Sequence, residues 1–222
     1  MTQLPPPAAF LSRPDSISDL VYAAIRDAIV ERQFAAGERV TEAGLAKWLN
    51  VSKTPVREAM LRLQEVGLVE ADAIRGSRVV QPSDVALRQA FEIREALEVF
   101  AAERAAETLS DAERSRLTEV AKLSLESARA GDVQTFRDRD REFHRLLTTG
   151  NPRMQKLLAD TGDFLRTVRE QDVPSVEDMI DSAQTHVVIA NAVSEGDSEA
   201  ASREMRKHIR AVRAHYSIGA DA

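Results

Sequence analysis

The chain contains no cysteine among its 222 residues. This absence excludes disulfides, thiolate zinc sites, iron–sulfur clusters and cysteine nucleophiles. Aromatic residues make up only 5% of the chain, which argues against a platform on which the bases of a single strand would stack. No stretch approaches the roughly 18 apolar residues that span a bilayer, and the first fifteen residues do not resemble a secretory signal. We therefore expect a cytoplasmic protein with no membrane partner.

The charge is distributed unevenly along the chain. Residues 1–80 hold ten basic and ten acidic side chains, whereas residues 81–222 hold twenty basic and twenty-six acidic ones and all four histidines. We interpret this asymmetry as two domains with different roles. Because the net charge is −6, any binding to DNA must depend on local basic residues.

The first part of the chain follows the order helix, helix, helix, hairpin. Residues 1–16 carry four prolines and are expected to form a disordered arm before a domain over residues 17–81. Ser18 is the expected cap of the first helix, whose apolar stripe begins at Leu20. Two short apolar stretches around residues 75–77 indicate a hairpin after the third helix.

The third helix begins with side chains suited to duplex DNA. Short hydroxyls and long cations at a helix N-terminus attract phosphate, and arginine can bind guanine bidentately. The hairpin tip adds a cation that can enter the minor groove. The candidates are Ser52, Lys53, Thr54, Arg57, Arg75 and Gly76. The alternative is a solvated basic face, because residues 52–78 hold five basic and four acidic side chains and charge alone does not decide.

The segment VSKTPVREAMLRLQEVGLVE, followed by RGSRVV, resembles the winged-helix signature of the GntR family of bacterial transcription regulators. The resemblance covers nearly all of residues 18–80 and implies a winged helix-turn-helix that binds duplex DNA. The family's DNA-contacting positions fall on the six candidates above. One departure is Ala43, where many relatives carry an arginine, so that contact is either missing or supplied by Arg39 or Lys47.

From Asp84 onward the pattern is helical throughout. Segments over roughly 84–107, 111–130, 132–149, 152–171, 175–195 and 197–217 fit amphipathic helices. Ser110, Asp132, Ser175 and Asp197 are the expected N-caps. Short connections between six helices predict an antiparallel bundle over residues 84–217, so the chain as a whole is expected to be mainly α-helical.

Ionisable side chains interrupt the apolar stripes of three of these helices. Asp140 and His144 lie one turn apart, His186 lies on the next-to-last helix, and His208 and His215 lie on the last. Buried imidazoles and a carboxylate suit a divalent metal such as zinc, nickel, manganese or iron. The alternative is that each histidine is separately a hydrogen-bonded core residue. A di-iron site is disfavoured because position 141 is arginine, so His144 does not complete a Glu-x-x-His motif. The absence of His-Glu-x-x-His counts against a zinc protease.

Residues 84–217 are similar to the helical effector domain of the FadR-type branch of GntR regulators, the FCD domain. The matching residues are the run Arg94 to Glu98, Asp140, His144, His186, Gly196-Asp197 and His208. The resemblance implies that Asp140, His144, His186 and His208 hold the metal, most often zinc, and that open coordination positions accept a small organic acid. His215 is outside the family's four and is expected to be a core or pocket residue.

Arg94 is the candidate for binding that acid. It lies beside the apolar stripe of its helix, where an inward guanidinium could bind a ligand carboxylate bidentately. The alternative is a surface pair with Glu98, four residues further on.

These observations predict a DNA-binding transcription regulator, a repressor by the family's usual arrangement, with no catalytic residues. We expect a homodimer that binds an inverted-repeat operator and whose helical domain binds a divalent metal and a small carboxylate metabolite. One alternative is a regulator whose metal is structural or is itself the signal. The other is a metal-dependent hydrolase or lyase that uses the same histidine cluster, which would require a general base beside the metal.

Overall fold

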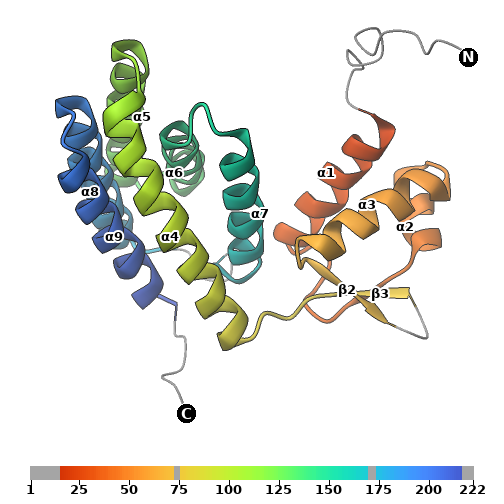
Figure 1. Ribbon diagram of the computed structural model, residues 1–222. Helices are drawn as coiled ribbons and strands as arrows, with labels where there is room; N and C mark the ends of the chain where they lie inside the picture. The colour runs from red at the N-terminus through yellow and green to blue at the C-terminus, as the bar shows by residue number, and fades with distance from the viewer. Residues whose placement is uncertain (1–15, 73–75, 170–173, 217–222) are drawn as a thin grey trace, which may run out of the picture. The chain divides into compact units, whose positions relative to one another are not determined.

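The computed structural model describes residues 16–72, 76–169 and 174–216. The chain divides into two compact units, Met1–Gln81 and Pro82–Ala222 (Figure 1), and each is described by itself. All of the expected N-terminal arm except Ser16 lies outside the described residues, as does Arg75 at the expected hairpin tip.

The first unit is a winged helix-turn-helix, as predicted. Its elements are α1 (Ile17–Val30), β1 (Arg39–Val40), α2 (Glu42–Leu49), α3 (Lys53–Glu65), β2 (Val69–Asp72) and β3 (Gly76–Val79). The three strands form an antiparallel sheet in the order β1-β3-β2, with Val69 opposite Val79 and Arg39 opposite Arg78. The hairpin was predicted from the sequence, but the two-residue strand β1 is too short to give an alternating pattern and was not.

Helix α1 begins two residues earlier than predicted. Ser16 caps it and forms a capping box with Asp19, whereas the hydroxyl of Ser18 donates to Glu58. The buried face consists of Val21, Tyr22, Ile25, Ala28, Ile29 and Val30. Leu20, expected on this face, is 60% exposed, because the stripe is centred one position further along the helix.

The second unit is a bundle of six helices within the described residues, again as predicted. They are α4 (Asp84–Thr108), α5 (Asp111–Arg129), α6 (Val133–Leu147), α7 (Pro152–Arg169), α8 (Val176–Glu195) and α9 (Ser198–Ala214). The four predicted N-caps each accept a hydrogen bond from the backbone of the first turn, and Ser110 and Ser175 complete capping boxes. The starts of these helices are therefore determined locally.

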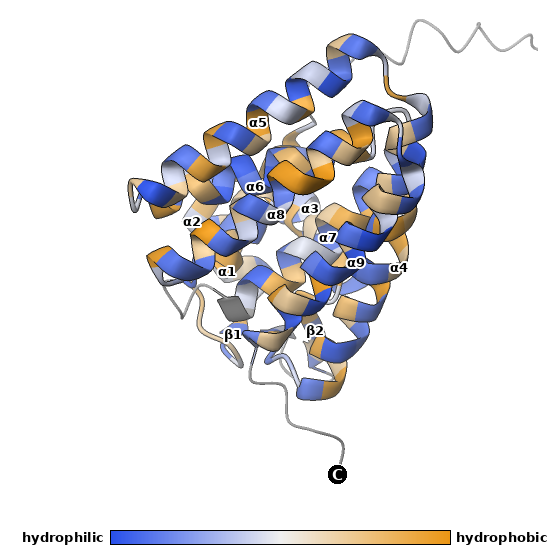
Figure 2. Ribbon diagram, turned by 90° about the vertical axis from the view of Figure 1, so that its left-hand side faces the viewer, coloured by the Kyte–Doolittle hydropathy of each residue, from blue (hydrophilic) through white to orange (hydrophobic). Residues whose placement is uncertain are grey.

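Hydrophilic and hydrophobic residues alternate along the helices of the bundle, as the colours of Figure 2 show. The apolar sides form a core that includes Phe91, Leu117, Phe143, Ile189 and Met205, each at most 1% exposed. Arg114 joins three helices, since its guanidinium donates to the carbonyls of Ala106, Leu109 and Val193. Over the described residues, no helix combines the length and apolar character required to cross a membrane.

Candidate functional site

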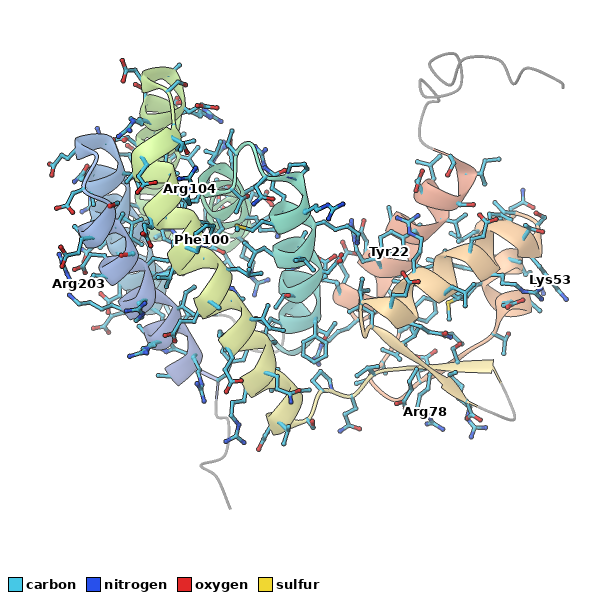
Figure 3. All side chains as sticks on the ribbon, viewed as in Figure 1. Tyr22, Lys53, Arg78, Phe100, Arg104 and Arg203 are labelled. Atoms are coloured by element: carbon cyan, nitrogen blue, oxygen red, sulfur yellow. The ribbon has the colours of Figure 1, made fainter. Side chains whose placement is uncertain are left out.

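The N-terminus of α3 presents its polar side chains to solvent. Ser52 is the N-cap residue, but within the described part of the chain its hydroxyl makes no capping bond. Lys53 and Thr54 are exposed, and Figure 3 shows Lys53 projecting away from the ribbon. Val56, Met60 and Leu63 anchor the opposite face in the core. The fold therefore holds this helix end rigidly while leaving its polar atoms available to a ligand.

Arg57 lies one turn further along the same exposed side of α3. Its side chain is 67% exposed, and its Nε donates to Oε1 of Glu42 on α2 at 3.1 Å. This ion pair joins the two helices of the helix-turn-helix and raises the pKa of Arg57 through the hydrogen bond and charge of Glu42. Arg57 therefore remains charged and is already paired with a carboxylate of its own domain.

The hairpin strand β3 begins at Gly76, whose conformation requires glycine. Its φ is +101°, and a Cβ atom there would lie 3.0 Å from the carbonyl oxygen of Val40. Arg39 and Lys47 are the candidates to replace the arginine contact that Ala43 lacks. Lys47 is exposed on α2, whereas a guanidinium nitrogen of Arg39 lies 3.3 Å from the carboxylate of Asp72.

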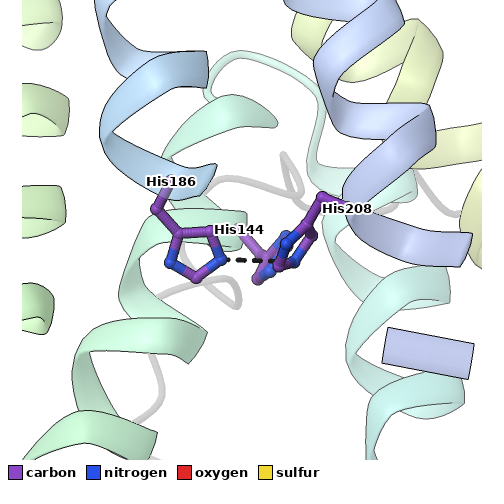
Figure 4. A group of neighbouring side chains, drawn as sticks. All are labelled: His144, His186 and His208. Carbon is purple, nitrogen blue, oxygen red and sulfur yellow. Dashed lines mark hydrogen bonds between the residues drawn. The ribbon is translucent and has the colours of Figure 1, made fainter. Parts of the chain in front are cut away.

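Three imidazoles converge inside the bundle. His144 on α6, His186 on α8 and His208 on α9 each offer a nitrogen, and these three atoms lie within 4.8 Å of one another (Figure 4). Nε2 of His186 and Nε2 of His208 are 3.3 Å apart. Oδ1 of Asp140 lies 3.7 Å from Nε2 of His186 and 3.9 Å from Nε2 of His144.

These atoms fit a divalent metal ion. Two ligand atoms that are each about 2.0–2.1 Å from a tetrahedral zinc lie roughly 3.3 Å apart. Nε2 of His186 and Nε2 of His208 are at this separation, and the distances from Asp140 to His186 and His144 are somewhat longer, at 3.7 and 3.9 Å. Both ring nitrogens of His144 are buried and make no hydrogen bond within the described residues, so Nε2, which faces the other imidazoles, is available to an ion. Nitrogen and carboxylate donors without thiolate suit zinc, nickel, manganese or iron.

Burial keeps one of these imidazoles neutral. His186 is fully buried and stacks on Phe143, with ring centroids 4.2 Å apart. Desolvation, followed by the charge of His144, lowers the pKa of His186 to about 3. A neutral imidazole is the form that binds a metal, so this histidine is ready to act as a ligand near neutral pH.

Arg94 and Glu98, on α4, lie against the histidines. Nε of Arg94 donates to Oε1 of Glu98 at 2.5 Å, and Oε2 of Glu98 lies 2.5 Å from Nδ1 of His144. The pair considered above as a surface alternative therefore forms, but in the interior, with side-chain exposures of 12% for Arg94 and 4% for Glu98. Burial alone would raise the pKa of Glu98, but the guanidinium of Arg94 and the adjacent imidazole of His144 outweigh it and hold that pKa well below its usual range.

Glu98 is a site residue that the sequence reasoning missed. It stands one turn after Arg94 in the run that carries the resemblance to the FCD domain, and this spacing was the available signal. Its proximity to His144 depends on how α4 packs against α6, which periodicity within one helix does not reveal.

A cavity of about 480 Å³ opens beside the cluster. Arg94, Asp140 and His144 line one side of it, and α7 contributes Gly162 and Arg166. Three further arginines of α6 lie on its wall, namely Arg137, Arg141 and Arg145. Of the described residues, five arginines and five carboxylates line the cavity, which also reaches the candidate metal ligands. It is therefore a polar site that suits a small charged molecule, and its arginines are groups that can bind a carboxylate.

His215 does not belong to the site. We expected a core or pocket residue, but it is the C-cap of α9, its side chain is 60% exposed, and its Nδ1 lies 3.6 Å from Asp178. The stripe of α9 that carries His208 ends with the helix at Ala214, so the inward direction does not extend to residue 215.

A winged helix-turn-helix next to a helical domain with a ligand cavity defines a class of DNA-binding regulators rather than enzymes. Comparison with known families agrees: residues 17–79 match the family described as "Bacterial regulatory proteins, gntR family", and residues 89–211 match the FCD domain. The chain belongs to the GntR family of transcription regulators with an FCD domain. Family membership, rather than any missing residue, sets aside the hydrolase or lyase alternative.

The chain is similar to curated relatives along most of its length. The repressor RspR of Escherichia coli K12 is 28% identical over 202 residues, covering 88% of this chain and 87% of that protein. A Paenarthrobacter nicotinovorans protein named "Probable D-xylose utilization operon transcriptional repressor" is 32% identical over 211 residues, covering 89% and 91%.

Solved structures show the same fold. A GntR regulator from Rhodococcus sp. RHA1 aligns with a TM-score of 0.71 at 24% identity and covers 89% of this chain and 96% of its own. Escherichia coli McbR/YncC aligns with a TM-score of 0.73 at 20% identity and covers 90% and 96%.

Proposed function

We propose that this protein is a homodimeric repressor whose helical unit binds a divalent metal ion and a small organic acid that changes its affinity for operator DNA. One observation carries the proposal: three imidazoles and Asp140 lie together beside a cavity whose wall, over the described residues, holds five arginines and five carboxylates, in a chain that belongs to a family of DNA-binding regulators. The protein would act on DNA in the bacterial cytoplasm.

Asp140, His144, His186 and His208 are the proposed metal ligands, and zinc is the proposed ion. Support comes from the separations of their ligand atoms, the unpartnered Nε2 of His144 and the lowered pKa of His186. A bound ion would supply a Lewis acid that attracts the carboxylate of an acid in the cavity. The residues themselves arrange the donors and bury them, with side-chain exposures of 0% for His186, 13% for His144 and 17% for Asp140.

Arg94 is the proposed contact for the acid. It lines the cavity beside Asp140 and His144, and burial of its side chain strengthens an interaction with a carboxylate. A volume of about 480 Å³ leaves room for a small metabolite rather than a long-chain one.

The proposed operator contacts are Ser52, Lys53, Thr54, Arg57, Arg75 and Gly76. Exposure of the α3 N-terminus supports this set, and Arg75 lies outside the described residues. A homodimer would place two such helices on an inverted repeat. Ile93 and Phe100, seven residues apart on α4, are 48% and 49% exposed and offer an apolar surface for a second copy.

The acid can alter repression only by binding the DNA-competent and DNA-incompetent states with different affinities. Several relatives are named as repressors, which supports release of the operator when the acid binds. A regulator whose metal is structural or is itself the signal is the second candidate, because the imidazole cluster is complete without any acid.

The experiment that tests the proposal combines composition with function. Elemental analysis and native mass spectrometry of the purified protein identify the retained ion and small molecule. Operator binding is then titrated with zinc alone and with zinc plus a panel of small mono- and dicarboxylic acids. A response to acid only when zinc is present supports the proposal. A response to zinc alone supports the second candidate, and a protein that binds no divalent ion overturns both.

A further inference from the structure

Two side chains of α4 form a continuous contact with a candidate metal ligand on α6. Nε of Arg94 is 2.5 Å from Oε1 of Glu98, and Oε2 of the same carboxylate is 2.5 Å from Nδ1 of His144. The first contact is a hydrogen bond, and the second is an ion-pair contact whose alignment is not that of a regular hydrogen bond. At this separation the carboxylate oxygen lies within reach of a proton on Nδ1.

The contact between Glu98 and His144 determines which ring nitrogen of His144 keeps a lone pair that can bind a metal ion. A neutral imidazole carries one N–H, which donates, while the other nitrogen keeps its lone pair. An ionised carboxylate can only accept, so Glu98 selects the tautomer with the proton on Nδ1. Nε2 is then left with its lone pair, and it is Nε2 that lies 3.9 Å from Oδ1 of Asp140 on the side of the other imidazoles.

Arg94 explains how Glu98 can be ionised in the interior. A buried carboxylate without a partner is costly, and an adjacent guanidinium compensates for that cost. Glu98 is 4% exposed and Arg94 is 12% exposed, so the pair is shielded from solvent. Neither residue is explained by packing alone, since apolar side chains of similar volume would fill the same space at lower cost.

We propose that Glu98 and Arg94 are positioning residues of the metal site: Glu98 orients His144 and fixes its tautomer, and Arg94 holds Glu98 in place. This inference rests on the proposed function of the histidine cluster. It also changes what is expected of Arg94, because a residue that both lines the cavity and supports a metal ligand should affect metal binding as well as the response to acid.

The tautomer can be measured directly in the full-length wild-type protein. With ¹⁵N-labelled histidine, two-bond ¹⁵N–¹H correlation spectra distinguish protonation at Nδ1 from protonation at Nε2. We expect His144 to carry its proton on Nδ1, both with zinc and in the presence of a chelator. Protonation at Nε2 would overturn the proposal, and since no residue is changed, the result does not depend on whether a variant folds.

Zinc titration against a competing chelator tests the energetic consequence. Glu98→Gln retains shape but can donate as well as accept, so it no longer selects one tautomer, and we expect roughly ten- to hundredfold weaker zinc binding. Glu95→Gln is the matched control: it lies on the same helix, but its carboxylate accepts from Arg210 on α9. We expect its zinc affinity to remain within about twofold of wild type, below the range for loss of an outer-shell partner.

The outcomes distinguish failure of the proposed function from failure of the positioning role of Glu98 alone. If wild-type protein binds no zinc, nickel, manganese or iron, the proposed function fails. If it binds zinc and Glu98→Gln, folded by circular dichroism, binds as tightly as Glu95→Gln, only the present inference fails. If Glu98→Gln does not fold, Glu98→Asp, which keeps the charge but withdraws it by one methylene, replaces it in the titration, and the tautomer measurement decides in either case.

Discussion

Arg57 and Glu42 form an ion pair that joins α3 to α2, with Nε of the arginine 3.1 Å from Oε1 of the glutamate. The side chain proposed to contact a base is therefore held in an extended, exposed position before DNA arrives. On binding, it must exchange this carboxylate for a base edge or a phosphate. Glu42 would then stand near the negatively charged duplex.

This relationship leads to opposite expectations for its two members. Arg57→Ala should weaken operator binding by about ten- to hundredfold, the usual loss for a specific base contact, with much less effect on an unrelated duplex. Glu42→Gln should bind the operator at least as tightly as wild type, because it removes a competitor and a repelling charge. Fluorescence anisotropy at one fixed salt concentration measures both, and unchanged operator binding by Arg57→Ala would remove it from the recognition set.

His186, which is buried in the metal site, and His215, which is exposed outside it, provide a test of the ligand set. His186→Ala should remove the bound ion, because it deletes a nitrogen that lies 3.3 Å from Nε2 of His208 and 3.7 Å from Oδ1 of Asp140. His215→Ala should leave metal content unchanged, since His215 is exposed at the end of α9. Elemental analysis after dialysis provides the measurement. Wild-type metal content in His186→Ala would show that the ligand set is wrong.

The stability of the protein without metal should fall in mild acid. His186 has a folded pKa of about 3, whereas in the unfolded chain its pKa is near the ordinary 6.5. Between these values the unfolded chain binds a proton that the folded chain does not, so the free energy of unfolding decreases as pH falls below about 6.5, by at most about 1.4 kcal/mol per pH unit for one proton.

Urea unfolding in the presence of a chelator at pH 7, 6 and 5 measures this dependence. His186→Asn removes the titrating group and should give a flatter profile over the same range. Glu98 affects stability in a separate pH range. Because its pKa is lowered in the folded state, its stabilising contribution to the free energy of unfolding is lost only as the pH falls below the ordinary glutamate pKa of 4.5. Parallel profiles for wild type and His186→Asn would contradict the assignment of this effect to His186.

Local signals predicted most of the fold. Ser110 with Glu113 and Ser175 with Asp178 mark helix starts within four residues of sequence, and the structure contains both capping boxes. Locality also explains the errors. Ser16 and Ser18 both precede the apolar stripe of α1. In the structure Ser16 caps the helix, whereas the hydroxyl of Ser18 donates to Glu58, a residue far away in the sequence.

The site was predictable only in part, for a physical reason. The inward stripes placed His144, His186 and His208 on buried faces, but convergence at one point depends on how α6, α8 and α9 pack. The same stripe argument misplaced His215, because it assumed that α9 continues. Glu98 was considered only as a surface partner of Arg94, since nothing within α4 indicates that His144 lies beside it.

Gly162 tests the role of the cavity. It lies inside α7, where glycine costs about 1 kcal/mol relative to alanine, and it lines the cavity. A Cβ atom at this position would have no described heavy atom within 4 Å. Gly162→Ala should therefore raise the stability of the helical unit by about 1 kcal/mol, since it improves helix propensity without a steric clash.

If an acid occupies the space beside Gly162, a larger side chain at this position should weaken the binding of that acid. Gly162→Met should weaken the response of operator binding to the acid that wild type binds, while zinc affinity stays unchanged because residue 162 is not a proposed ligand. Lys156→Met is the matched control, because it places the same side chain on a 70%-exposed position of α7. Thermal unfolding and acid titration of the three variants separate stability from binding. Equal acid responses in Gly162→Met and Lys156→Met would show that the acid does not occupy this cavity.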